Sequence, residues 1–296
     1  MSSILKWLAG VFILLCLILG FSLTWPMTAS RVLYPLVEAI MIEDFVGVTA
    51  EQASAAFALI ASGLSQKGYR TARDVMRLEG YLAELKNNHV EYGEKRYWLT
   101  FMGEPSPTEP WGWQLDGHHL VVNFFVLGDQ VVMTPTFMGS EPTHAQQGKY
   151  VGTRVFDDEL SAGLTLFNAL TDAQQTQAIL TREKTGNNNH GELFQDNAVV
   201  PYAGIRLAEL DESQRATAIK LIQLYTDQVR PGHSDIKLTE ILQHWDQTYF
   251  AWVGETGPDA DFYYRIHSPV VMIEFDSHRA SISTLTPIMH QLCRTV

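Results

Sequence analysis

Segments with the pattern of β-strands fall into two groups that lie far apart in the sequence, residues 97–135 and 248–276. Each group is rich in aromatic and β-branched residues, in runs of strand length separated by turns that contain Gly, Pro or Asp. The stretch between the groups has the three- and four-residue apolar spacing of helices. Because strands and helices are segregated along the chain, the sequence predicts an α+β fold in which both groups form an antiparallel sheet packed by helices.

Turn residues divide these groups into individual elements. The loop 103–110 contains three prolines, which cannot donate to a strand ladder, and the pair Gly128-Asp129 predicts a tight hairpin. The expected strands are 97–102, 111–116, 118–126, 130–135, 248–253, 262–267 and 270–276. Helices are expected within 32–77, among them 50–61, and the helical pattern continues through 78–86 to a break at Asn87. Further helices are expected at 157–170, 172–182, 209–229 and 238–247, and Thr49 and Asp211 are the expected N-caps.

The N-terminal segment, residues 1–30, has the composition of a signal anchor or signal peptide. No charged residue occurs in 7–30, and 7–25 is long and apolar enough to cross a hydrocarbon core of roughly 30 Å. Lys6 precedes this stretch, which predicts that the C-terminal bulk lies on the extracytoplasmic side. We expect a retained anchor rather than a cleaved peptide, because bulky Met27 stands two positions before Ala29.

Composition and net charge limit how many domains the rest of the chain can form and which partners it can bind. A chain of 296 residues that is 46% apolar can bury one large core, so residues 31–296 are expected to form a single domain. The net charge of −12 argues against a nucleic-acid partner, since no cluster of Lys and Arg is present to neutralise phosphates. We therefore expect a protein that is anchored in the inner membrane through residues 7–25, or secreted, with a small molecule as its partner.

Histidines and carboxylates near the expected strands are the candidates for chemistry. His118 and His119 are adjacent, so on a strand their side chains would point to opposite faces, and at most one could face a given site. Glu274 and Asp276 share a face at a spacing of two. Together with His290 they offer imidazole and carboxylate ligands without thiolate, which suits a divalent Zn, Fe or Mn ion with an open position.

The sequence leaves several roles for these residues open. In the metal hypothesis, His118 or His119 and His290 bind the ion with Glu274 or Asp276, and Arg265 orients an anionic or hydroxylated substrate. A metal-free acid–base site would use Glu274 with one of the two adjacent histidines. In a purely structural role, one histidine bonds a backbone carbonyl and Glu274 pairs with Arg265 or Arg294 between strands.

Aromatic residues on the expected strands also allow two interpretations. Trp111, Trp113 and Tyr263 would ordinarily fill the core, but they could line a ligand pocket. Two functional classes therefore stay open, and the sequence does not decide whether the protein is an enzyme. One is a metal-dependent enzyme, hydrolytic or oxidative, that acts on a small molecule. The other is a membrane-tethered, non-catalytic ligand-binding protein of the cell envelope.

Several of these motifs together resemble domain-of-unknown-function family 3500. The resemblance lies in residues 111–120, 134–139 and 263–276, and further matches at 195–197, 202–204 and 250–252 extend it over most of the chain after the anchor. It implies an uncharacterised exported protein and brings no established activity. Members of the family typically end with a histidine-rich segment. This chain retains His290 but has Ile288 where the first of two alternating histidines falls.

Overall fold

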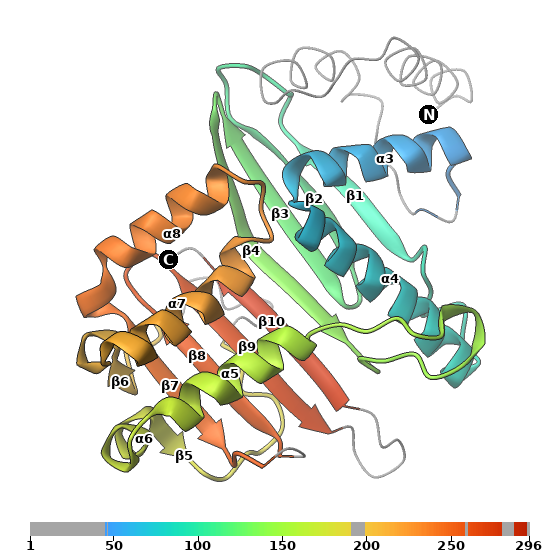
Figure 1. Ribbon diagram of the computed structural model, residues 1–296. Helices are drawn as coiled ribbons and strands as arrows, with labels where there is room; N and C mark the ends of the chain where they lie inside the picture. The colour runs from blue at the N-terminus through green and yellow to red at the C-terminus, as the bar shows by residue number, and fades with distance from the viewer. Residues whose placement is uncertain (1–44, 46, 191–198, 258–259, 280–286, 295–296) are drawn as a thin grey trace.

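The computed structural model describes residues 45, 47–190, 199–257 and 260–279, and the backbone of residues 287–294 (Figure 1). Of residues 278 and 279, too, the backbone alone is described. The expected anchor at 1–30 and the motif at 195–197 lie outside these residues. Among the helices that the structure describes, none combines the length and the apolar character needed to cross a bilayer.

One large sheet forms the centre of the described part of the protein. Its strands follow the order β1-β2-β3-β4-β10-β9-β8-β7-β5, with β6 paired to β7, and every pairing is antiparallel except β5 with β7. The strands are β1 (Tyr97–Met102), β2 (Trp111–Gly117), β3 (Leu120–Leu127), β4 (Gln130–Ser140), β5 (Ile179–Thr181), β6 (Ile205–Arg206), β7 (Tyr249–Gly254), β8 (Phe262–His267), β9 (Met272–Arg279) and β10 (Pro287–Arg294).

The prediction of an α+β fold with an antiparallel sheet is confirmed, and the two strand groups do contribute to one sheet. They do not touch directly, however. The C-terminal strand β10, which the sequence did not suggest, lies between β4 of the first group and β9 of the second. The prediction that a helix continues to Arg182 was wrong, because that helix ends at Ala178 and the chain enters β5.

Six α-helices lie within the described residues, and side-chain caps fix the start of several. Thr49 and Asp211 accept hydrogen bonds from the backbone N–H groups of Gln52 and Gln214, which confirms both expected N-caps. Asn87 ends a long helix in the left-handed conformation, at the expected break. The helices are α3 (Ala50–Gly63), α4 (Gln66–Lys86), α5 (Asp157–Ala169), α6 (Asp172–Ala178), α7 (Glu212–Thr226) and α8 (His233–Gln243).

The large helices cover one face of the sheet, α3 and α4 over the first strand group and α5, α7 and α8 over the second (Figure 1). Tyr264 of β8 illustrates the packing, because its hydroxyl group bonds the backbone carbonyl of Glu159 in α5 and the hydroxyl of Tyr225 in α7. Neighbouring residues on each strand alternate between this face and the opposite one. We call the opposite face the open face.

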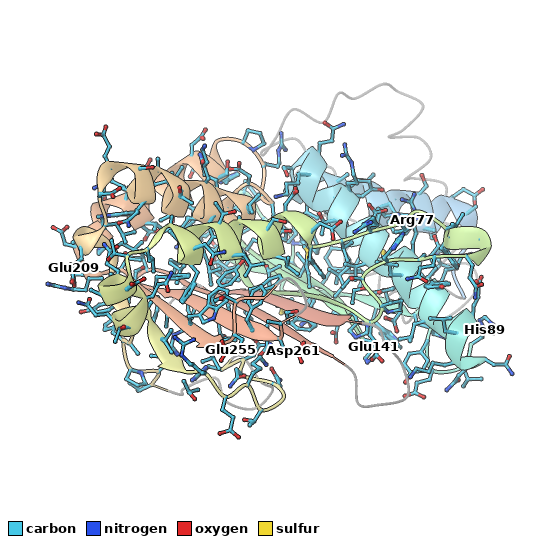
Figure 2. All side chains as sticks on the ribbon, turned by 60° about the horizontal axis from the view of Figure 1, so that its bottom comes forward. Arg77, His89, Glu141, Glu209, Glu255 and Asp261 are labelled. Carbon is cyan, nitrogen blue, oxygen red and sulfur yellow. The ribbon has the colours of Figure 1, made fainter. Side chains whose placement is uncertain are left out.

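The segment that follows β5 crosses part of the open face. Lys184, Asn188 and His190 of this segment contact Asp276 and Glu274 of β9. In Figure 2 the helices lie above the sheet and this segment, in yellow, runs below it. The sheet is therefore sandwiched between helices and an irregular segment at β8 and β9, and both candidate carboxylates of β9 lie on the side away from the helices.

Candidate metal centre

The two adjacent histidines form the turn of a hairpin rather than part of a strand. β2 ends at Gly117 and β3 begins at Leu120, so His118 and His119 make up the whole connection. The prediction that their side chains point to opposite faces was wrong, because strand alternation does not apply within a two-residue turn. Their rings lie side by side, with centroids 3.9 Å apart.

A glycine holds this turn close to β1. A Cβ atom on Gly117 would lie 2.3 Å from the ring of Tyr97, far inside a van der Waals contact. Any larger residue at this position would therefore push the hairpin away from β1. The tight approach fixes where the two imidazole rings stand relative to the helix that packs above them.

Glu79 of α4 supplies the partner that both imidazoles share. His118 Nδ1 lies 2.9 Å from one carboxylate oxygen of Glu79, and His119 Nδ1 lies 2.6 Å from the other. The Glu79 side chain is 1% exposed, while that of His118 is 48% exposed. The cluster is thus anchored in the interior and opens to solvent through one imidazole.

The sequence did not identify Glu79, although it carries a signal that could have been used. The buried face of α4 includes Ala72, Val75 and Leu82, and Glu79 lies in the same stripe at helical spacing. A carboxylate in the middle of an apolar stripe is rarely left unpaired. Such a position indicates a buried cationic or imidazole partner elsewhere in the chain.

The charges in the cluster support one another. Burial raises the pKa of Glu79, but the hydrogen bonds and charges of His118 and His119 outweigh it, and the pKa of this carboxyl is lowered overall. The hydrogen bond to Glu79 raises the pKa of His118 against burial, and the charges of Glu79, Glu141 and Glu91 act in the same direction. The carboxylates around His118 therefore give this site a negative electrostatic potential, which favours the binding of a cation.

A tyrosine hydroxyl beside this cluster has no hydrogen-bond partner among the described residues. Tyr97 is fully buried, and its register places it opposite Gly117, next to the histidine turn. Burial raises the pKa of its hydroxyl well above the ordinary range, and the charge of Glu79 adds to this effect. Tyr97 is therefore a neutral donor in the vicinity of the carboxylate.

The three side chains have the composition of a metal site. One ligand atom from each of Glu79, His118 and His119 lies within 4.8 Å of the others. Two imidazoles and one carboxylate on one side of an ion leave further coordination positions open, as in His₂Glu zinc enzymes and in non-haem iron enzymes. A metal would replace the protons that the imidazoles now share with Glu79.

The other expected metal ligands lie elsewhere in the sheet. Glu274 and Asp276 are fully buried on the open face of β9, and two strands, β4 and β10, separate β9 from β3. With strands about 4.8 Å apart, this separation is roughly 14 Å. The sequence led us to expect that one of the two histidines shares an ion with Glu274 or Asp276. At this distance they cannot share one.

His290 is aligned with this second group. Its backbone pairs in register with Asp276 on one side and with Gly139 on the other. Its side chain lies outside the described residues, so its expected role as a metal ligand stays a prediction.

The two catalytic candidates, Glu274 and Arg265, lie on neighbouring strands but form no ion pair with each other in the structure. Arg265 lies directly opposite Glu274 in the register of β8 and β9. The carboxylate of Glu274 nevertheless contacts Tyr263 and His190, while Arg265 donates to the backbone carbonyl of Pro201. The sequence also missed Lys184 and His190, because an Asn-rich turn gave no reason to place them at β9.

The aromatic residues expected to line a pocket do not meet at one place. Trp111 and Trp113 are buried on the helix face, where Trp113 stacks on Phe124 with ring centroids 4.5 Å apart. Tyr263 lies on the open face and donates to Glu274. The two tryptophans thus belong to the core beneath α3 and α4, and a common ligand platform with Tyr263 is not formed.

Comparison with known proteins gives one match. A family model described as a protein of unknown function, DUF3500, matches residues 43–296. No curated protein and no solved structure matches the chain. The resemblance seen in the sequence motifs is therefore confirmed.

Proposed function

Since the chain belongs to the DUF3500 family, whose function is unknown, we propose from the site geometry alone that it is a metal-dependent enzyme acting on a small molecule. The observation that carries this proposal is the convergence of Glu79, His118 and His119, with ligand atoms within 4.8 Å of one another. A divalent Zn, Fe or Mn ion suits this mixture of imidazole and carboxylate ligands.

The open coordination positions would allow such an ion to take part in catalysis. Three protein ligands leave room for water, which a bound divalent metal activates as a nucleophile, or for a substrate oxygen. The exposure of His118 supports this role, since it leaves the site accessible to a small molecule from the solvent side. Hydrolysis and oxidation both remain within this proposal, and the identity of the metal separates them.

We further propose that the protein works outside the cytoplasm, tethered to the inner membrane through residues 7–25 or secreted. The uncharged N-terminal segment, preceded by Lys6 and flanked by Trp7 and Trp25, supports this proposal. The net charge of −12 fits a small-molecule substrate better than a nucleic acid.

Metal analysis of the purified full-length protein tests the site. Plasma mass spectrometry should find close to one metal ion per chain in the wild type, and much less in Glu79→Gln and His119→Ala. His244→Ala is the matched control, because this histidine bonds a backbone carbonyl in α8, away from the cluster. It should retain the metal.

Two outcomes would contradict the proposal. If the wild type takes up no Zn, Fe or Mn even after reconstitution, the cluster is a hydrogen-bonded charge pair and not a metal centre. If all variants keep the metal, the ion binds elsewhere. Once a metal is established, its removal by a chelator and its restoration should abolish and recover turnover of a substrate.

A further inference from the structure

The open face of β8 carries two buried nitrogen-bearing side chains in succession. Arg265 and His267 alternate with Tyr264 and Ile266, which point into the core. Arg265 is 2% exposed and His267 is 4% exposed. Because they are two residues apart on one strand, their Cα atoms are about 7 Å apart, and both side chains point away from the helices.

The neighbouring carboxylates are already supplied with donors. Glu274 accepts from the Tyr263 hydroxyl at 2.6 Å and from the backbone N–H of His190 at 3.0 Å. Asp276 contacts Lys184 Nζ at 2.7 Å and accepts from the Asn188 backbone N–H at 2.5 Å. Both carboxylates therefore hold the segment after β5 against the sheet.

Arg265 and His267, in contrast, keep unused hydrogen-bonding capacity. Arg265 Nη2 donates to the carbonyl of Pro201 at 3.2 Å, but its Nε has no partner among the described residues. The Nδ1 atom of His267 has none either. No carboxylate of the described part of the chain lies within ion-pair distance of Arg265, although Glu274 stands opposite it in the register.

Nitrogen atoms that could form hydrogen bonds but do not are unfavourable in a protein interior. A buried polar group without a hydrogen-bond partner destabilises the folded state, and a charged group does so more strongly. Native proteins contain few of them, and a group of them marks a place where water, an ion or a ligand completes the hydrogen bonds. Here two such nitrogens adjoin on one strand, and one of them carries a permanent positive charge.

Pro201 and Tyr202 contact this pair on the open face. The ring of Tyr202 packs against that of His267 at a tilt of 44°, with ring centroids 4.5 Å apart, and Tyr202 itself is 46% exposed. Tyr202 thus connects the buried imidazole of His267 to the surface, and Pro201 contacts Arg265 beside it.

We propose that Arg265 and His267 bind a small organic monocarboxylate, whose two oxygens accept from Arg265 Nε–H and His267 Nδ1–H. A guanidinium group binds a carboxylate more strongly than a neutral acceptor. Glu274 and Asp276 lie on the neighbouring strand, and their repulsion is about twice as large for a dianion as for a monoanion, which favours a monocarboxylate. The site is separate from the metal centre and does not depend on it.

Acetate and acetamide form a matched pair of probes, because they have the same shape and differ in charge. In calorimetric titrations of the full-length protein, acetate should bind saturably, while acetamide and sodium chloride at equal concentration should not. His267→Gln should weaken acetate binding about tenfold, the loss of one hydrogen bond to a charged group. Arg265→Lys, which keeps the charge but not the Nε–H group, should weaken it further.

Two controls keep this test separate from folding and from the metal proposal. Arg215→Gln removes an arginine that lies over the ring of Trp245, far from β8 in the sequence, and should leave acetate binding unchanged. Glu79→Gln should leave it unchanged as well, even if metal is lost. Equal binding of acetate and acetamide, or no saturable binding by the wild type, would overturn the proposal and assign the two nitrogens to ordered water.

Discussion

Glu79 shows what a single residue can reveal about a site. Its position within the apolar stripe of α4 indicates a buried partner, but the sequence gives no indication of which residue this is, because His118 lies 39 positions away. The histidine pair was recognised as chemically interesting, and Glu274 and Asp276 were correctly placed on one face. What sequence could not supply was which of these residues meet, since that depends on strand order.

The hydrogen bond between His118 and Glu79 predicts opposite pH responses of the apo and metal-bound protein. The pKa of His118 is raised, so its contribution to stability is present below its unfolded pKa of about 6.5 and is lost as pH rises through the raised value. A metal ion binds only the deprotonated imidazole, so metal binding becomes stronger as pH rises over the same range.

Thermal unfolding from pH 5.5 to 8.5, with chelator and with saturating zinc, measures both responses. The difference in melting temperature between the two conditions should widen as pH rises. The His118→Gln variant should show a much smaller dependence. A difference that is constant over this range would contradict the assignment of His118 as a metal ligand.

His267 predicts a second pH effect, with the opposite sign. Burial, aided by the charge of Arg265, lowers the pKa of His267 to about 4. The folded protein therefore keeps this imidazole neutral while the unfolded chain takes up a proton below about pH 6.5, so stability is lost as pH falls from there towards 4. The full loss is on the order of 3 kcal/mol.

Chemical unfolding at pH 7 and pH 5 of the wild type and of His267→Gln tests this effect. The variant should lose less stability than the wild type between the two values, because it has no proton to take up at this position. The carboxylates titrate alike in both proteins and cancel in the comparison. Equal losses would mean that His267 is not the buried neutral group described above.

The contact between helix α5 and strand β8 requires a glycine at position 163. A Cβ atom on Gly163 would lie 2.3 Å from the ring of Tyr264. Alanine is ordinarily the better helix former, by about 1 kcal/mol. Here Gly163→Ala should instead destabilise the protein by about 1–3 kcal/mol, the usual cost of overpacking a core.

Urea unfolding of Gly163→Ala beside Asn168→Ala measures this balance. Asn168 is exposed on the same helix, so its replacement improves helix propensity without a clash and should change stability by less than about 0.5 kcal/mol. Stabilisation by Gly163→Ala would show that α5 can move away from Tyr264 at little cost.

Local pattern predicted most elements, and it failed where a neighbour in space decided the outcome. β1 was predicted with its observed bounds, and the caps at Thr49 and Asp211 follow from local chemistry. The histidine turn was taken for the start of a strand, with Gly117 as the turn, whereas β2 includes Gly117 and β3 begins only at Leu120. β5 was taken for helix because pairing with β7 overrides its short helical pattern.

For the whole molecule, the decisive element is the strand nearest the C-terminus. β10 pairs with β4 along one edge and with β9 along the other, and so joins the two halves of the sheet. Its position could not be read from its own residues, since any apolar strand could occupy either an edge or the centre of a sheet. The grouping of strands along the chain predicted two halves but not the strand that connects them.

Removing β10 should therefore affect the entire fold and not only its end. A chain that ends at Thr286 would leave β4 and β9 with unpaired edges in the middle of the sheet, which invites aggregation. A chain that ends at Arg294 keeps all of β10 and serves as the control. The shorter chain should lose cooperative thermal unfolding and elute as aggregates in size-exclusion chromatography, whereas the control should match the wild type. A shorter chain that stays monomeric and unfolds at the wild-type temperature would mean that the two halves hold together through helix contacts instead.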